Sequence, residues 1–190
     1  MGLTGLCLAA SRDPPSSVTV SDYGSDTLEN MQFNVQLNSS TSAISVDAIS
    51  LDWCCPSSYT HLKPDIILAA DCTYSPDICI SIVACIQSIL LNGGTNPVSF
   101  LDYYCISQNF ANFADEEVHK KQPFALVAST LRSEDTFNVF QQEIHKSQLV
   151  MLDITDWGTK KLTGDLFFQS DKSAEIIKLF YIYVCRKKRR

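Results

Sequence analysis

The sequence predicts an α/β protein built on a doubly wound, mostly parallel sheet. Strand and helix patterns alternate along the chain at the spacing of βαβ units. The strand pattern at 65–71 is apolar throughout between two acids, which is typical of a parallel strand buried on both faces. The chain has 190 residues, 45% of them hydrophobic and 19% charged, which is enough for one domain with its own core. We therefore expect a single domain over residues 1–190.

The first elements follow from turn and capping signals. A turn with glycines leads into a helix over residues 2–10, and the prolines of the next loop cannot continue it. Residues 18–20 are β-branched and form a short strand. Asp26 has the spacing of a capping box with Glu29, so we expect an amphipathic helix over 26–38.

The middle of the chain contains two further strand patterns and a buried helix. Residues 44–51 alternate as a strand, and the apolar strand at 65–71 follows. The pattern at 77–91 predicts a helix that is apolar almost all round, and Gly93 ends it. The irregular, charged stretch 95–122 reads as a surface insertion.

The last third returns to regular elements. Residues 124–128 form an apolar strand, and a helix over 133–146 begins with Ser133 as its cap. Two final strands lie near 148–153 and 175–184. No internal repeat is visible, so the chain is one continuous α/β arrangement.

The charge of the chain is divided between an acidic body and a basic tail. The net charge is −6, yet residues 186–190 are all basic, and the rest of the chain carries −11. An acidic body is a poor surface for phosphates, so nucleic acid is an improbable partner. The tail leaves three interpretations open: a nuclear localisation signal, a contact to ribosomal RNA, or a solvated terminus.

The cysteines indicate reduced thiols rather than disulfides or a metal site. There are eight cysteines and three histidines, without a Cys-x-x-Cys pair or zinc spacing. The opening residues make a poor signal peptide, and no apolar run is long enough to span a membrane. We therefore expect a cytoplasmic monomer, with a nuclear location open because of the tail, no metal and no membrane partner.

Three of the predicted strands lead to an acid at their carboxyl ends, where ligands bind in doubly wound sheets. Asp22 is placed to accept hydrogen bonds from ribose hydroxyls. Trp53 offers a flat face for adenine, with Asp52 able to accept from the adenine amino group. Asp71 follows the most buried strand and should have an altered acidity or a specific partner at a pocket mouth. Ordinary turn chemistry is the alternative for each acid, but three together favour a nucleoside pocket.

These segments together resemble the seven-strand, S-adenosylmethionine-dependent protein-lysine methyltransferases of eukaryotic family sixteen. The resemblance rests on the glycine turn at 2–6, on the strand ends just described, and on the Asp-x-x-Tyr signature from Asp71 to Tyr74. Residues 128–137 and Phe140 are similar to the elongation factor 2 lysine methyltransferase branch. The resemblance covers about residues 2–91 and 124–184 and implies a Rossmann-like methyltransferase sheet.

The resemblance also implies roles for individual residues. S-adenosyl-L-methionine would be the cofactor, and Asp71 and Tyr74 would be the catalytic residues that shape the channel for the substrate lysine. A buried core tyrosine is the alternative for Tyr74. The residues that the resemblance assigns to the cofactor are Gly2, Gly5, Asp22, Asp52, Trp53 and Ala70.

The sequence departs from that family at its start. The family's first strand and its acid-x-Gly-x-Gly motif should precede Gly2, in the middle of the sheet between the strands that end near Asp22 and Asp71. We therefore expect a sheet that lacks most of the first strand and of the glycine loop, with two parallel strands short of a neighbour. Either the working chain is longer or this is a truncated form. We predict weak or no S-adenosylmethionine binding by chain 1–190, and a micromolar Kd from calorimetry would contradict this.

Three functions follow in order of preference. The first is methyl transfer to a lysine of a protein substrate, such as a translation elongation factor. The second is a catalytically inactive, methyltransferase-like interaction module. The third is a nucleotide-binding oxidoreductase on the same fold, which the Asp-x-x-Tyr signature disfavours.

Overall fold

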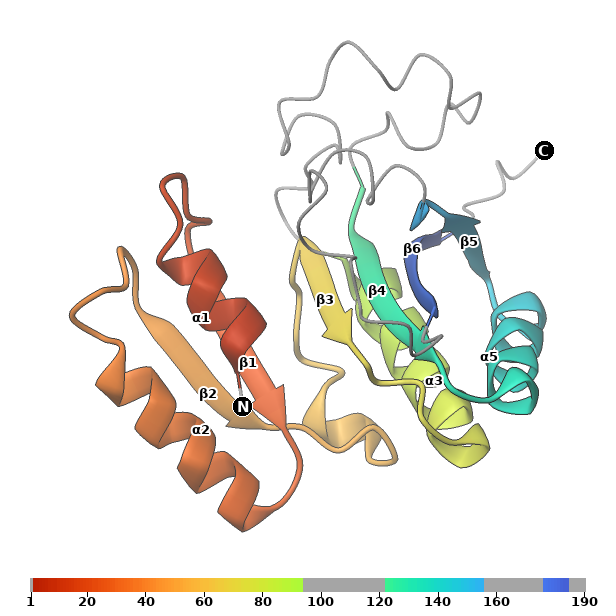
Figure 1. The fold of residues 1–190 in the computed structure, drawn as a ribbon, viewed down its shortest axis with the longest axis horizontal. Coiled ribbons are helices and arrows are strands. Elements are labelled where there is room, and N and C mark those ends of the chain that lie inside the picture. Colours follow the sequence, from red (N-terminus) through yellow and green to blue (C-terminus); the bar gives the residue numbers. More distant parts are fainter. Residues whose placement is uncertain (1, 94–121, 156–175, 185–190) are drawn as a thin grey trace, which may run out of the picture. The chain divides into compact units, whose positions relative to one another are not determined.

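The computed structural model describes residues 2–93, 122–155 and 176–184, and it has the predicted α/β fold of a Rossmann-like protein. The chain divides into two compact units, Met1–Tyr59 and Thr60–Arg190. The first contains a two-stranded sheet of order β1-β2, and the second a four-stranded sheet of order β3-β4-β6-β5 (Figure 1). Each unit is described by itself below.

The first unit consists of two strands and two helices, with a short 3-10 turn at Pro56–Ser58. Strands β1 and β2 are parallel, with Val18 opposite Val46 and Asp22 opposite Ser50. The helices and strands agree with the predicted ones to within a few residues. They are α1 (Leu3–Ala9), β1 (Val18–Asp22), α2 (Ser25–Leu37) and β2 (Val46–Ser50).

The core of the first unit forms on one side of this sheet. Val18 and Val20 are buried while Thr19 between them is exposed, as the two-residue period of a strand requires. Both helices pack on the side to which the valines point, with Ala9 of α1 and Met31 of α2 in one apolar cluster. The predicted amphipathic helix is therefore confirmed, and Met31 lies on its buried face.

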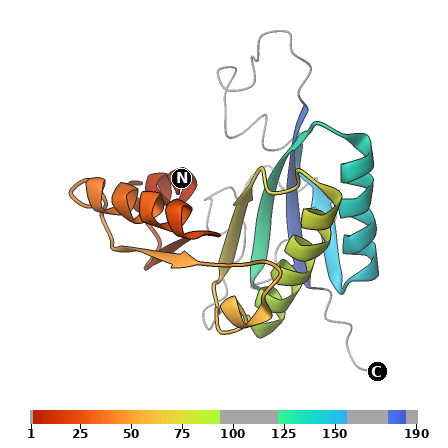
Figure 2. The same cartoon turned by 90° about the horizontal axis from the view of Figure 1, so that it is seen from below.

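The second unit contains a mixed sheet. Strands β3 and β4 are parallel, whereas β6 lies between β4 and β5 and is antiparallel to both. Helices α3 and α5 pack together and lie on the same face of the sheet (Figure 2). The elements are β3 (Ile66–Ala70), α3 (Pro76–Asn92), β4 (Phe124–Leu131), α5 (Glu134–Lys146), β5 (Leu149–Asp153) and β6 (Ile176–Val184).

Strand β3 is less buried than its sequence predicts. No residue of β3 is fully buried, and Leu68 is 39% exposed. In the described part of the chain, β3 pairs with β4 alone and forms an edge of its sheet. The expectation that this is the most buried strand is therefore wrong, because an apolar sequence buries both faces only when neighbours cover them.

The core of the second unit lies instead around β4 and β6. Phe124 and Tyr181, which are completely buried, have ring centroids 5.0 Å apart. On the helical face, Phe137 of α5 stacks on Phe180 of β6 at 5.6 Å, and Phe140 is buried beside them. Aromatic packing thus holds α5 on the sheet.

Two predicted features lie outside the described residues: almost all of the insertion at 95–122, and the basic tail at 186–190. In the described part of the chain, no helix combines the length and the hydropathy that crossing a membrane requires.

Candidate active site

The Asp-x-x-Tyr loop lies directly after β3, at the carboxyl end of the parallel pair β3-β4. Asp71 adopts a left-handed backbone conformation with φ 55°, which is uncommon for a residue with a side chain. Its N–H donates to the carbonyl oxygen of Ala128 on β4 at 2.7 Å. Backbone outliers of this kind concentrate at functional sites, and this one coincides with the predicted catalytic acid.

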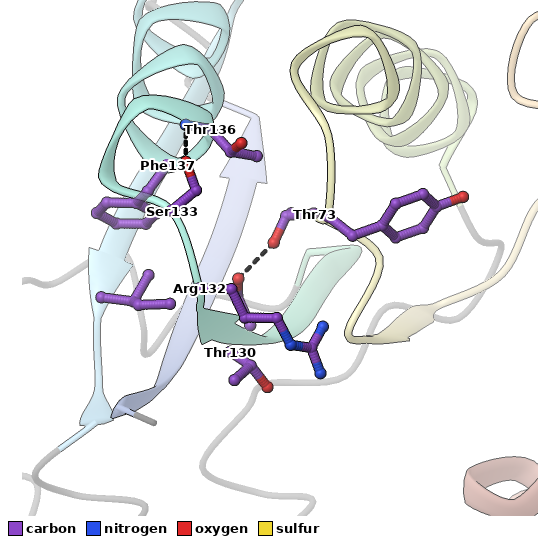
Figure 3. A pocket seen from close by; sticks show the side chains of 9 residues that line it. Thr73, Thr130, Arg132, Ser133, Thr136 and Phe137 are labelled. Carbon is purple, nitrogen blue, oxygen red and sulfur yellow. Dashed lines mark hydrogen bonds between the residues drawn. The ribbon is translucent and has the colours of Figure 1, made fainter. Parts of the chain in front are cut away.

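A buried hydroxyl pair makes a second connection between this loop and β4. The hydroxyl groups of Thr73 and Ser129 form a hydrogen bond, and both residues are buried (Figure 3). A buried hydroxyl without a partner would be costly, so this bond ties the loop to β4.

An ion pair makes a third connection. Asp71 Oδ2 lies 2.9 Å from Nη2 of Arg132, at the start of the turn between β4 and α5. Both side chains are about half exposed. This is the specific partner that the position of Asp71 predicted.

The first turn of α5 completes this end of the sheet. The Thr136 N–H donates to Oγ of Ser133 at 3.3 Å, so the predicted cap is confirmed (Figure 3). A cavity of about 20 Å³, with room for about one water molecule, lies between this turn and the loop. It is lined by Thr73, Tyr74, Ser129, Thr130, Leu131, Arg132, Ser133, Thr136 and Phe137.

Tyr74 faces solvent. Its side chain is 60% exposed while it also lines the small cavity. The alternative of a buried core tyrosine is therefore wrong. An exposed aromatic residue three positions after a paired carboxylate, on a loop anchored to a rigid strand, is a common arrangement in binding sites.

The glycines assigned to the cofactor belong to the first unit. Gly2 precedes α1 in a left-handed conformation with φ 77°, which favours glycine. Gly5 lies within α1, where a Cβ atom would come within 2.4 Å of Val20 Cγ1 on β1. Close approach of a helix to a strand is the role of the last glycine in nucleotide-binding turns. A helix can also pack this closely on a strand where no nucleotide binds.

Three further assigned residues lie at the carboxyl end of β1 and β2. Asp22 Oδ1 accepts the Tyr23 N–H, and Asp52 Oδ1 accepts the Cys54 N–H, each at 2.8 Å. The Leu51 N–H donates to the Asp22 carbonyl at 2.9 Å, which joins the two strand ends. Trp53 follows Asp52 and is half-buried.

These residues fit part of an adenosyl site. In the first unit, α1 begins at the end where β1 and β2 finish (Figure 1), so the glycine turn and the two acids share one end of that sheet. Each aspartate has a second oxygen for ligand hydroxyl or amino groups. Ala70, the remaining assigned residue, ends β3 in the second unit and is exposed. The roles of all six cofactor residues stay predictions.

Sequence reasoning gave no role to Thr73, Ser129 or Arg132. Thr73 lies inside the signature, and the other two lie in the segment that carries the branch resemblance. Local patterns could not show their importance, because their contacts connect the ends of two strands that are far apart in sequence. The one available signal was a cation four residues after the predicted strand 124–128 and directly before the predicted cap Ser133.

Comparison with known proteins fits this geometry. An uncharacterized protein of Dictyostelium discoideum is 27% identical over 180 residues, an alignment that covers 81% of this chain and 42% of that relative. The chain thus spans less than half of the relative's length. A family model described as lysine methyltransferase, a family whose chemistry depends on S-adenosylmethionine, matches residues 1–112, which include every predicted site residue. Because this match covers more than half of the sequence, the chain belongs to the lysine methyltransferase family.

Proposed function

We propose that this chain transfers a methyl group from S-adenosyl-L-methionine to the side chain of a lysine in a protein substrate. The observation that carries the proposal is the anchored loop from Asp71 to Tyr74. It presents a carboxylate and an exposed aromatic ring at the carboxyl end of β3, and a bond from each of Asp71 and Thr73 to β4 fixes it. This is the end of a doubly wound sheet at which ligands bind.

The two side chains have complementary tasks toward a lysine. The cofactor supplies the methyl group when bound. The Asp71 carboxylate accepts a hydrogen bond from the target amine and directs it, and the Tyr74 ring lies along the apolar stem of the lysine. Because the chemistry needs little besides alignment and exclusion of water, a firmly positioned loop accounts for most of the expected rate.

The substrate we propose is a translation elongation factor in the cytosol, of the elongation factor 2 type. The support is the likeness of residues 128–137 to that branch. This segment contains Ser129 and Arg132, which contact Thr73 and Asp71 of the Asp-x-x-Tyr loop, and Ser133, which caps α5. The net charge of −6 also suits a basic surface around the target lysine.

Radiolabelled methyl transfer tests the proposal. Chain 1–190 is incubated with a panel of purified proteins that includes elongation factor 2, and tritiated S-adenosylmethionine is supplied at a high concentration to offset the weak binding that we predict for this chain. Labelled lysines are mapped by mass spectrometry. We expect label on lysine, and an Asp71→Asn variant with about 100-fold lower rate, the scale of a misaligned reactant. An Asp13→Asn variant, changed at an exposed acid of the loop between α1 and β1, should retain full activity. Label on no protein, or equal label with Asp71→Asn, would refute this function.

A second candidate is the inactive interaction module, which one observation favours. Among the described residues, β1 pairs with β2 alone and β3 with β4 alone, so each has an edge without a neighbouring strand. An edge of this kind can accept a strand from another protein. A stable chain that binds protein partners but neither binds nor uses S-adenosylmethionine would decide for this candidate.

A further inference from the structure

Arg132 lies outside the segment that matches the family, yet it contacts the predicted catalytic acid. Its Nη2 is 2.9 Å from Asp71 Oδ2, and the side chains are 51% and 45% exposed. Ion pairs this open to water contribute little to stability. The pair is therefore better explained by what it does to the carboxylate than by what it adds to the fold.

The surrounding backbone is already fixed without this pair. The Asp71 N–H donates to Ala128, and the Arg132 N–H donates to the Thr130 carbonyl at 3.0 Å in a tight turn. The ion pair therefore orients the Asp71 side chain and places a positive charge beside its carboxylate. It engages Oδ2 of Asp71, and a carboxylate has a second oxygen that can accept from another donor.

We propose that Arg132 is a positioning residue that offsets the charge of Asp71, so that the target lysine is held there as a neutral amine. This inference rests on the proposed function, because a methyl acceptor needs a free lone pair and an ammonium group has none. An isolated carboxylate would favour the ammonium form of the lysine. A guanidinium on the same carboxylate opposes that preference.

The other titratable groups on the elements that meet here cannot replace Arg132. Among the described residues of the loop and of the first turns of α3 and α5, Arg132 supplies the positive charge. The remaining groups are acids, a thiol and a phenol. They are Cys72, Tyr74, Asp77, Glu134 and Asp135. On the neighbouring strand β6, Lys178 lies opposite Ser129, but its Nζ is 2.9 Å from Asp153 Oδ2, so its charge is already paired. Without Arg132, the groups around Asp71 would therefore favour a cation.

The pH dependence of kcat separates this role from a structural one. Arg132→Gln should lower kcat about tenfold near neutral pH, the effect of a one-unit rise in the pKa of the bound lysine. The rate should recover toward wild type as the pH rises, with KM unchanged or lower. Arg132→Lys keeps the charge and should keep the wild-type profile. In an Asp71→Asn background, Arg132→Gln should produce a smaller alkaline shift, because Arg132 is then no longer held beside the amine.

An equal loss of kcat at every pH would overturn the proposal, and so would an Arg132→Lys variant as impaired as Arg132→Gln. The matched control is Lys146→Gln, which removes another exposed ion pair, with Glu143 on α5. Its profile should equal that of the wild type. Far-UV circular dichroism confirms that each variant is folded.

A binding measurement tests the same inference without activity. n-Butylammonium, which resembles the end of a lysine side chain, is titrated into labelled protein while the amide signals of residues 71–74 are followed by NMR. We expect several-fold tighter binding to Arg132→Gln than to wild type, and a loss of binding with Asp71→Asn. Equal affinity of wild type and Arg132→Gln would refute the charge role. A chain with the expected response but without methyl transfer would refute the proposed function alone.

Discussion

Gly5 decides how closely helix α1 lies against strand β1. Helix propensity alone predicts that Gly5→Ala stabilises the chain by about 1 kcal/mol. The structure reverses that sign, because the new Cβ atom would lie 2.4 Å from Val20 Cγ1 and 3.2 Å from Val18 Cγ1. We expect a net loss of about 1–3 kcal/mol, the usual cost of overpacking, measured by urea unfolding.

The exposed neighbour Thr4 provides the control for this prediction. Thr4→Ala changes the same helix without meeting the valines, so it should be neutral or slightly stabilising. Adding Val20→Ala to Gly5→Ala should cost less than the two single changes together, because it removes the clashing atom. A Gly5→Ala chain as stable as wild type would show that α1 can move away from β1.

The cysteines of the chain should differ sharply in reactivity. The six described cysteines differ in burial: Cys7, Cys54 and Cys55 are exposed, whereas Cys79 and Cys85 are buried. Burial raises the pKa of the Cys85 thiol to about 12 and also raises the pKa of Cys79. At about pH 8, roughly one Cys85 thiol in ten thousand is then ionised. We expect iodoacetamide to modify the exposed Cys7, Cys54 and Cys55 first and to spare Cys85 until the chain unfolds, as read by peptide mass spectrometry.

The same shift gives a pH dependence of stability. A thiol whose pKa is higher in the folded state than in the unfolded state contributes stability at pH values below its unfolded pKa. That contribution declines as the pH rises from about 9 toward 12. Cys85→Ala should flatten the decline in the unfolding free energy over this window. If the stability of Cys85→Ala declined as steeply with pH as that of wild type, groups other than Cys85 would cause the decline.

At the scale of elements, the sequence predicted the features that depend on residues close together in the chain, such as helix caps. Ser133 was predicted as a cap because cap chemistry depends on residues three positions apart, and the Thr136 N–H confirms it. The burial of β3 was predicted incorrectly, because burial depends on neighbours that the strand's own sequence does not contain. For the same reason the sequence did not predict the Asp71–Arg132 ion pair, which forms only because the ends of β3 and β4 are adjacent in the sheet.

The cap of α5 is itself open to test. Ser133→Ala removes the acceptor for the Thr136 N–H and should lower the free energy of unfolding by about 0.5–2 kcal/mol. Ser133→Asp should retain most of that stability, since a carboxylate at a helix start also accepts and interacts favourably with the helix dipole. Thermal unfolding measures both. Equal stability of Ser133→Ala and wild type would mean that water replaces the cap.

At the scale of the whole molecule, the charge distribution predicts how the chain meets its substrate. The basic residues 186–190 offset part of an acidic body, and removing their charge takes the net charge from −6 to −11. Long-range attraction changes association rates more than chemistry and weakens as salt screens it. If the substrate is basic, replacing all five tail residues by glutamine should raise kcat/KM at low salt and leave kcat unchanged. At about 0.5 M salt the kcat/KM values of the two chains should be equal, because the screening length is then only a few ångströms.

The test is to measure kcat/KM for both chains across a salt series. A lower kcat/KM for the glutamine tail at low salt would instead indicate that the tail itself contacts an acidic surface of the substrate.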